Sequence, residues 1–140
     1  MTVVVAEYSA EDDGFVGSFC VFAQHGLLIF RDVRSVDTHA GWDGGDMVHA
    51  TPDSIYLRVQ TYVDGPVSVE VLEGESEDLV LDGAVLFDGT ISSQHGEFIL
   101  HDPDNWISMK VVTDNPGEAR LRVSGDAGHL PSALRLQIWY

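Results

Sequence analysis

The stretch Ser54-Ile-Tyr-Leu-Arg-Val-Gln-Thr-Tyr-Val-Asp-Gly-Pro-Val-Ser-Val-Glu-Val71 decides the fold class of this chain. Its first half places Ile55 and Leu57 on one face, and its second half repeats the alternation from Val67 to Val71. A period of two over a short run is typical of a half-buried β-strand. Asp64-Gly65-Pro66 lies between the two runs and predicts a tight hairpin turn.

The same period recurs along most of the 140 residues, of which 44% are hydrophobic. Strands are predicted at 2–8, 15–23, 26–31, 54–62, 66–73, 83–92, 96–101, 105–112, 117–124 and 133–140. No long window carries the apolar stripe of an amphipathic helix. The pattern predicts an all-β fold with little or no helix. We expect one domain over residues 1–140, an antiparallel two-sheet sandwich of jelly-roll or Greek-key type with about 9–10 strands.

Residues 32–53 fit no predicted strand and form a long, polar connection. A connection of this length in a compact domain is usually functional or disordered. Its candidate metal ligands are His39, Asp43, Asp46 and His49. Their spacing matches neither an H-E-x-x-H helix nor a calcium loop. We therefore expect a polar surface loop and no cofactor.

A second group of titratable residues lies at predicted turns, namely His95, His101, Asp102 and Asp104. Turns favour such residues for backbone reasons, because Asp and Asn side chains bond to their own main chain. We expect these four residues to be surface turn residues. Neither group shows the nucleophile context of a catalytic site, and the prediction is that the protein is not an enzyme.

The distribution of charge is the strongest functional signal. Asp and Glu number 23 against seven Lys and Arg, giving a formal charge of −16, and no basic residue lies between Arg58 and Lys110. Such a field repels nucleic acid and anionic lipid and attracts cationic proteins. The densest acidic part predicts the partner-binding residues Glu70, Glu73, Glu75, Glu77 and Asp78. The expected partner is a basic protein, with no nucleic acid and no membrane.

Two aromatic residues are added to the predicted partner-binding surface. Ile107 begins an alternating apolar set, and if that set is core, Trp106 faces solvent, where it can bind a protein or a sugar ring. The alternative is that Trp106 packs at the edge of the sandwich. Tyr56 lies on the outward face of its strand. The one cysteine, Cys20, lies in an apolar run, and we expect it to be a small buried hydrophobic residue.

The chain shows no apolar run near the ~18 residues of a membrane-spanning helix. Its first residues, Met1 to Ala6, lack the positive charge that opens a secretory signal, and Glu7 follows directly. A single unpaired cysteine suits a reducing compartment. The expected location is the cytoplasm.

Four segments together resemble the competence protein J-like family, small acidic inhibitors of a DNA-entry nuclease. They are the early strand Phe19-Cys-Val-Phe22, the pair Trp42-Asp43, the strands Ser54 to Tyr62 and Val67 to Val71, and Pro116-Gly-Glu-Ala-Arg-Leu-Arg-Val123. The resemblance implies a β-sandwich that binds and blocks a basic nuclease without catalysis of its own.

The charge and the resemblance favour a non-catalytic acidic binding protein. We expect an inhibitor or immunity-type protein that blocks a basic partner such as a nuclease or a toxin. The alternative is a jelly-roll module that binds a small ligand, either a carbohydrate or a metal, through Trp106 and the 32–53 connection.

Overall fold

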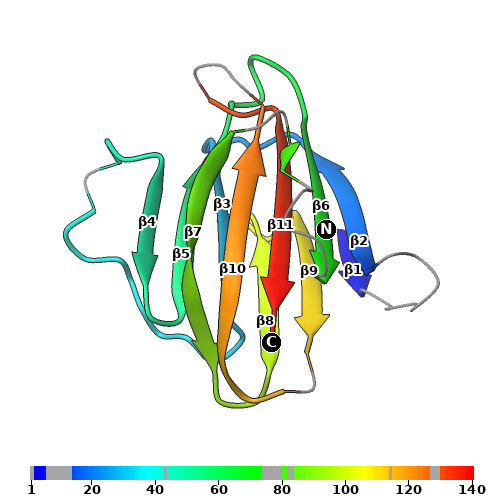
Figure 1. Cartoon of the computed structure of the whole chain (residues 1–140). Coiled ribbons are helices and arrows are strands. Elements are labelled where there is room, and N and C mark those ends of the chain that lie inside the picture. The colour runs from blue at the N-terminus through cyan, green and yellow to red at the C-terminus, as the bar shows by residue number, and fades with distance from the viewer. Residues whose placement is uncertain are drawn as a thin grey trace.

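The computed structural model describes residues 2–5, 14–42, 44–73, 80–81, 84–113, 115–126 and 130–140, and for residues 2–5 it describes the backbone alone. These residues form two facing layers of strands and no α-helix (Figure 1). The strands are β1 (Thr2–Val5), β2 (Phe15–Val21), β3 (Leu27–Asp32), β4 (Val48–Thr51), β5 (Ser54–Arg58), β6 (Val67–Glu73), β7 (Val85–Ser93), β8 (Glu97–His101), β9 (Ile107–Val112), β10 (Gly117–Gly125) and β11 (Ala133–Trp139). The predicted all-β sandwich is confirmed.

The first layer, sheet A, has the strand order β1-β9-β8-β3-β5-β4. The second layer, sheet B, has the order β2-β6-β11-β10-β7. Most neighbouring strands are antiparallel, as predicted, but β1 pairs with β9 and β6 pairs with β11 in parallel. Within the described residues, no helix has the length and apolar character that crossing a membrane requires.

A hydrophobic core fills the space between the two sheets. Sheet A contributes side chains such as Phe30 and Phe98, whose stacked rings lie 5.2 Å apart between centroids. Sheet B contributes Val69, Leu121 and Leu136, each at most 1% exposed. The alternating residues recognised in the sequence are therefore the residues that the two sheets bury against each other.

The hairpin predicted at Asp64-Gly65-Pro66 is wrong. The strand before it, β5, lies in sheet A, and the strand after it, β6, lies in sheet B, so residues 59–66 cross from one layer to the other. Ile55 and Val67 are both fully buried, but they enter the core from opposite sides. Alternation identifies the buried face of a strand and does not identify the neighbour with which it pairs.

The segment predicted to contain no strand, residues 32–53, contains the edge strand β4. It pairs with β5 alone, in the register Val48↔Leu57 to Thr51↔Ser54. Its side chains are exposed or partly exposed, so the strand has no buried alternating face that the sequence could reveal. The remaining strands fall within the ten predicted ranges or overlap them closely.

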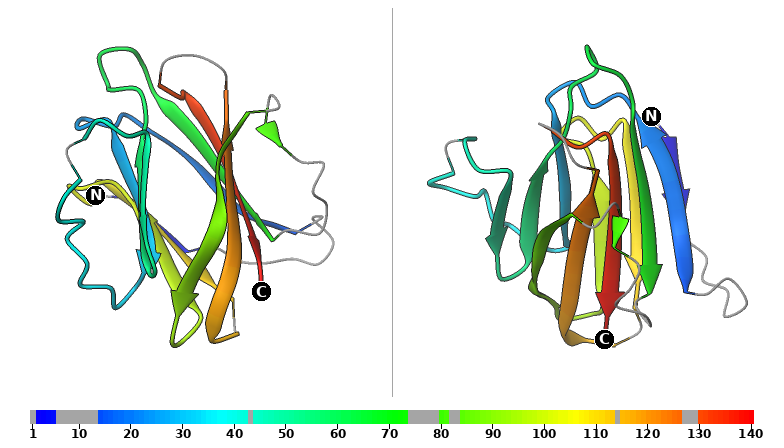
Figure 2. Two further views of the ribbon diagram at one scale, coloured as in Figure 1. Left: turned by 60° about the vertical axis from the view of Figure 1, so that its left-hand side comes forward. Right: turned by 45° about the horizontal axis from the view of Figure 1, so that its top comes forward.

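Three connections meet at one end of the sandwich, and two of them, 22–26 and 59–66, lie toward the top of Figure 1 and forward in the right view of Figure 2. They are residues 22–26, 59–66 and 102–106, called the apical loops below. The amide of Val59 donates to the carbonyl of Gly26 over 2.9 Å, and the His25 and Asp104 side chains lie 2.9 Å apart. Segments that are far apart in sequence therefore form one end surface.

Candidate functional site

The acidic residues predicted to bind a partner are only partly within the described structure. Glu70 and Glu73 lie on β6, whereas Glu75, Glu77 and Asp78 lie outside the described residues. The Glu70 carboxylate pairs with the Arg135 guanidinium of the neighbouring strand β11, and the Glu73 carboxylate accepts a hydrogen bond from the Tyr140 hydroxyl. The two described acids are thus engaged within the protein.

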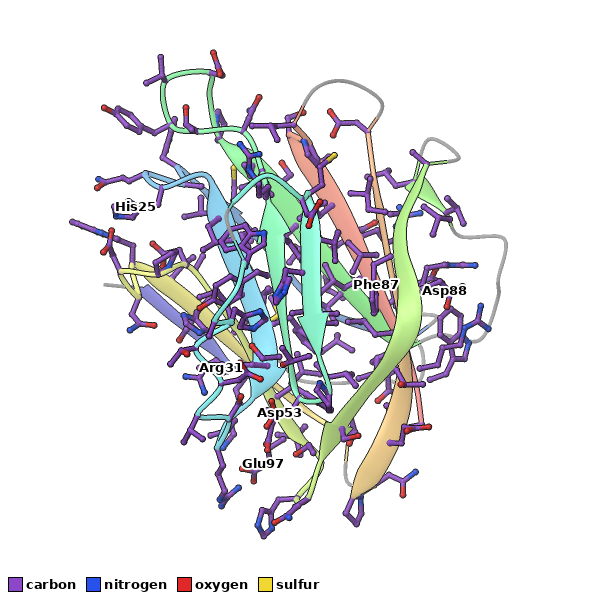
Figure 3. The ribbon with its side chains drawn as sticks, turned by 90° about the vertical axis from the view of Figure 1, so that its left-hand side faces the viewer. His25, Arg31, Asp53, Phe87, Asp88 and Glu97 are labelled. Carbon is purple, nitrogen blue, oxygen red and sulfur yellow. The ribbon has the colours of Figure 1, made fainter. Side chains whose placement is uncertain are left out.

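Other carboxylates on the sheets are balanced in the same way. The Arg120 guanidinium donates to both oxygens of Asp88, over 2.9 and 2.8 Å, and holds the pKa of that carboxyl below its ordinary value. Glu97 lies within 4 Å of both Arg34 and Lys110. Figure 3 labels Asp88 on β7 and Glu97 at the lower end of the sheets. Basic residues on or beside the strands therefore offset part of the negative charge that the strands carry.

The outer face of sheet B carries a cationic and aromatic cluster. The guanidinium carbons of Arg120 and Arg122 lie 4.6 and 5.2 Å from the centre of the Trp139 ring. Arg122 is 6% exposed and donates two hydrogen bonds to the side-chain oxygen of Gln137. Cation–π contact and burial hold these side chains in fixed positions on the sheet.

His39 is the central residue of the loop between β3 and β4. It has a left-handed backbone (φ 53°) and is 3% exposed. Its Nδ1 lies 2.8 Å from Nδ1 of His49, its Nε2 lies 2.7 Å from Oγ of Ser54, and its ring stacks on Tyr56 with 3.6 Å between centroids. Trp42 meets the edge of the same tyrosine at 5.2 Å. These contacts fasten the loop to sheet A, and Tyr56, predicted to bind a partner, lies beneath it.

The predicted metal candidates do not assemble into a ligand set within the described residues. A tetrahedral zinc ion bonded to two imidazoles at about 2.0–2.1 Å holds their nitrogens roughly 3.3 Å apart. The two Nδ1 atoms of His39 and His49 lie at 2.8 Å, the distance of one nitrogen donating to the other. Asp43 lies outside the described residues, and the Asp46 backbone carbonyl accepts a bond from the Trp42 indole. No group of three or more His, Cys, Asp or Glu in the described residues is placed to hold a metal ion.

Burial sets the protonation of His39. Loss of hydration holds its pKa below the ordinary value, and the neighbouring His49 acts in the same direction. The carboxylates of Asp37 and Asp53 act in the opposite direction. The 2.8 Å contact between the two Nδ1 atoms accommodates one proton, and a second proton there would set two N–H groups against each other.

The second group of titratable residues, predicted at turns, divides between buried and exposed positions. His101 and Asp102 were expected at the surface, but they are only 6% and 2% exposed. The Arg31 guanidinium donates to Nε2 of His101 over 3.1 Å, so Nδ1 carries the proton and donates to the carbonyl of Asp102. The Asp102 carboxylate accepts the amide of Ile107 over 3.1 Å. These bonds close the β8–β9 turn, which is why the residues are buried.

Trp106 is exposed, as predicted, because Ile107 turns into the core. Its exposed fraction is 54%, and it lines a cavity of about 310 Å³ with Phe22, Gln24 and Cys20 among its neighbours. The prediction that Cys20 is buried is wrong. Phe19 and Val21 face the core, so the residue between them faces solvent. The apolar run concealed this alternation.

Phe22, which lies in an apolar run and was not predicted to be a surface residue, is 61% exposed. The same alternation through β2 carries the signal, because Phe22 follows Cys20 on the outward side. Tyr62 was predicted to end a strand, whereas it lies, with Val63, in the crossing between the sheets, and the two residues are 55% and 75% exposed.

No protein-family model matches the chain, and no curated protein matches it. Two solved structures are similar in fold. One is ComJ from Bacillus subtilis, described as an inhibitor of the DNA-degrading activity of NucA, with a TM-score of 0.59, 10% identity, and coverage of 89% of this chain and 96% of ComJ. The other is the crocagin biosynthetic gene J product, with a TM-score of 0.58, 12% identity, and coverage of 87% and 94%. The resemblance to the competence protein J-like family is confirmed at the level of the fold.

Proposed function

We propose that this protein is a non-catalytic inhibitor that binds a cationic protein, with a nuclease as the favoured class of partner. The observation that carries the proposal is the similarity in fold to ComJ, which extends over 89% of this chain and 96% of ComJ. ComJ is described as an inhibitor of a DNA-degrading nuclease. The formal charge of −16 supports the same class, because nucleases that bind DNA present positive charge at their active sites.

The arrangement of titratable residues supports a binding role. Ser54, His39 and His49 form a chain of hydrogen bonds that resembles the serine–histidine pair of a hydrolase. However, Ser54 has no exposed surface, and His39 is 3% exposed. A nucleophile must reach its substrate. The cavities at β2, beside Trp106 and beside Asp32 are lined by other residues. We therefore assign this chain of bonds to loop anchoring.

Inhibition by an acidic protein has a defined electrostatic signature. Opposite charges accelerate encounter more reliably than they strengthen the final complex. The association rate should therefore fall on the order of tenfold or more as salt rises to about 0.5 M, while the dissociation rate changes much less.

The test measures binding by surface plasmon resonance and degradation of a DNA plasmid. The probes are NucA, the nuclease that ComJ inhibits, and a nuclease from the host organism of this protein. The proposal expects salt-sensitive association with at least one nuclease and loss of its activity. Failure to bind or inhibit either nuclease, at protein concentrations in the tens of micromolar, would overturn it.

A further inference from the structure

The apical loops expose a group of large apolar side chains. Phe22 is 61% exposed, Tyr62 55%, Val63 75% and Trp106 54%, and together they are called the apical patch. Scattered single exposures are normal on a protein surface, but a group on neighbouring loops marks an interaction site. Trp and Tyr are also the residues that most often dominate the binding energy of protein interfaces.

Contacts between the loops bring these side chains to the same end. The amide of Tyr62 donates to the carbonyl of Ala23 over 3.1 Å, which joins loop 59–66 to loop 22–26. Phe22 and Trp106 line the same cavity of about 310 Å³. Figure 3 shows the labelled His25 beside the β8–β9 turn, to which it is joined through Asp104.

The loops are held in shape by their own hydrogen bonds. Gln60 donates from its backbone to the carbonyl of Pro131 over 3.0 Å and from its side chain to the carbonyl of Pro66 over 2.8 Å. Asn105 adopts a left-handed backbone (φ 54°), and its amide donates to the carbonyl of Asp102. A surface ordered before binding loses less conformational entropy when a partner arrives.

The charge around the patch is of one sign. The three apical loops contain no Lys or Arg, and they contain Asp64, Asp102 and Asp104. Asp64 and Asp104 are exposed, whereas Asp102 is buried in its turn. On the sheets, Glu70 and Asp88 are paired with arginines, whereas the contact of Asp104 within the apical loops is with the His25 imidazole at 2.9 Å. The apical end therefore offers an apolar centre with carboxylates at its edge.

We propose that the apical patch is the surface through which this protein binds its partner, a protein segment that presents apolar or aromatic side chains flanked by Lys or Arg. The inference rests on the proposed function and specifies the surface that performs it. It replaces the β6 acids as the centre of the interface. A second copy of the chain fits the patch less well, because each copy carries a formal charge of −16.

The first experiment measures the affinity of variants for the nuclease that the wild-type protein inhibits. Trp106→Ala and Tyr62→Ala should each weaken binding by roughly 30-fold or more, as expected for interface hot spots. Val36→Ser and Val112→Ser are matched controls, since these valines are 91% and 46% exposed outside the apical loops, and they should change affinity less than about twofold. Unchanged thermal midpoints would show that every variant is folded.

The second experiment does not depend on a nuclease. A library of random peptides is selected on the immobilised wild-type protein, and the enriched peptides are tested against Trp106→Ala. The inference predicts peptides that combine Lys or Arg with aromatic or aliphatic residues and that bind the variant weakly.

The two experiments separate the two proposals. If the wild-type protein inhibits a nuclease but Trp106→Ala and Tyr62→Ala bind it as tightly as the wild type, the apical patch is wrong and the proposed function stands. If no nuclease is inhibited, the peptide selection still decides whether the apical patch binds a basic and apolar segment. Four outcomes would each refute the patch as the binding surface. The selection could enrich acidic peptides or no peptides, the peptides could bind Trp106→Ala as tightly as the wild type, or the protein could form a dimer that this substitution abolishes.

Discussion

Acidification should destabilise this protein through His39, and His39→Asn should remove that sensitivity. Asn is suited to the left-handed backbone at this position and retains a group that can bond to His49. The Asn side chain does not titrate. In the wild-type protein, burial holds the pKa of His39 below its ordinary value of 6.5. His39 therefore takes up a proton less readily in the folded protein than in the unfolded chain.

The sign and the size of the effect follow from proton linkage. When the pKa of a histidine is lower in the folded state, the unfolded chain binds more protons at low pH. The free energy of unfolding is therefore unaffected above pH 6.5 and decreases as the pH falls through and below that value. One histidine changes the free energy of unfolding by at most about 1.4 kcal/mol between about pH 7.5 and about pH 5.5. The carboxylates of Asp37 and Asp53 reduce the effect below this ceiling.

Urea denaturation followed by tryptophan fluorescence, at several pH values, measures the difference. The wild-type curve should fall more steeply than that of His39→Asn below pH 6.5, and subtraction removes the contribution of His101, which both proteins share. His95→Asn is the control, because it makes the same substitution at an exposed turn. Parallel curves for the wild type and His39→Asn would refute the role of the buried histidine pair.

Two further predictions concern the framework of the sandwich. Leu136→Ala, at a fully buried core position, should lower the free energy of unfolding by about 2–5 kcal/mol in urea denaturation, and a loss below about 1 kcal/mol would contradict the assigned core. Gly96 and Gly41 both have a positive φ, but a Cβ at Gly96 would lie 2.8 Å from the Thr113 hydroxyl, whereas one at Gly41 meets nothing within 4 Å. Gly96→Ala should therefore lower the thermal midpoint more than Gly41→Ala, and equal losses would show that backbone strain alone sets the effect.

Local alternation was sufficient to predict the strands, because each strand buries one face. It was not sufficient to predict their neighbours. Ile55 and Val67 have the same pattern and the same burial but enter from opposite sheets, so the turn between them could not be distinguished from a hairpin. The strand β4 places Val48 against the core but has no fully buried alternating face, and it therefore left no pattern.

The candidate site depends on tertiary structure even more strongly. The exposure of Trp106 could be predicted, because it precedes an alternating core set. The apical patch could not, since Phe22, Tyr62 and Trp106 come from three distant loops that the fold brings together. Net charge favoured a cationic partner as a hypothesis, but it did not show that Glu70 is paired with Arg135.

The proposed inhibition works by occupying the partner and not by modifying it. A titration of the protein into a fixed amount of the nuclease, with the remaining DNA degradation measured after short and long incubation, distinguishes the two. Occupation predicts a linear loss of activity that ends at an equimolar ratio and is the same at both times. Inactivation by a small fraction of an equivalent that deepens with incubation would show turnover and would rule out inhibition by occupation.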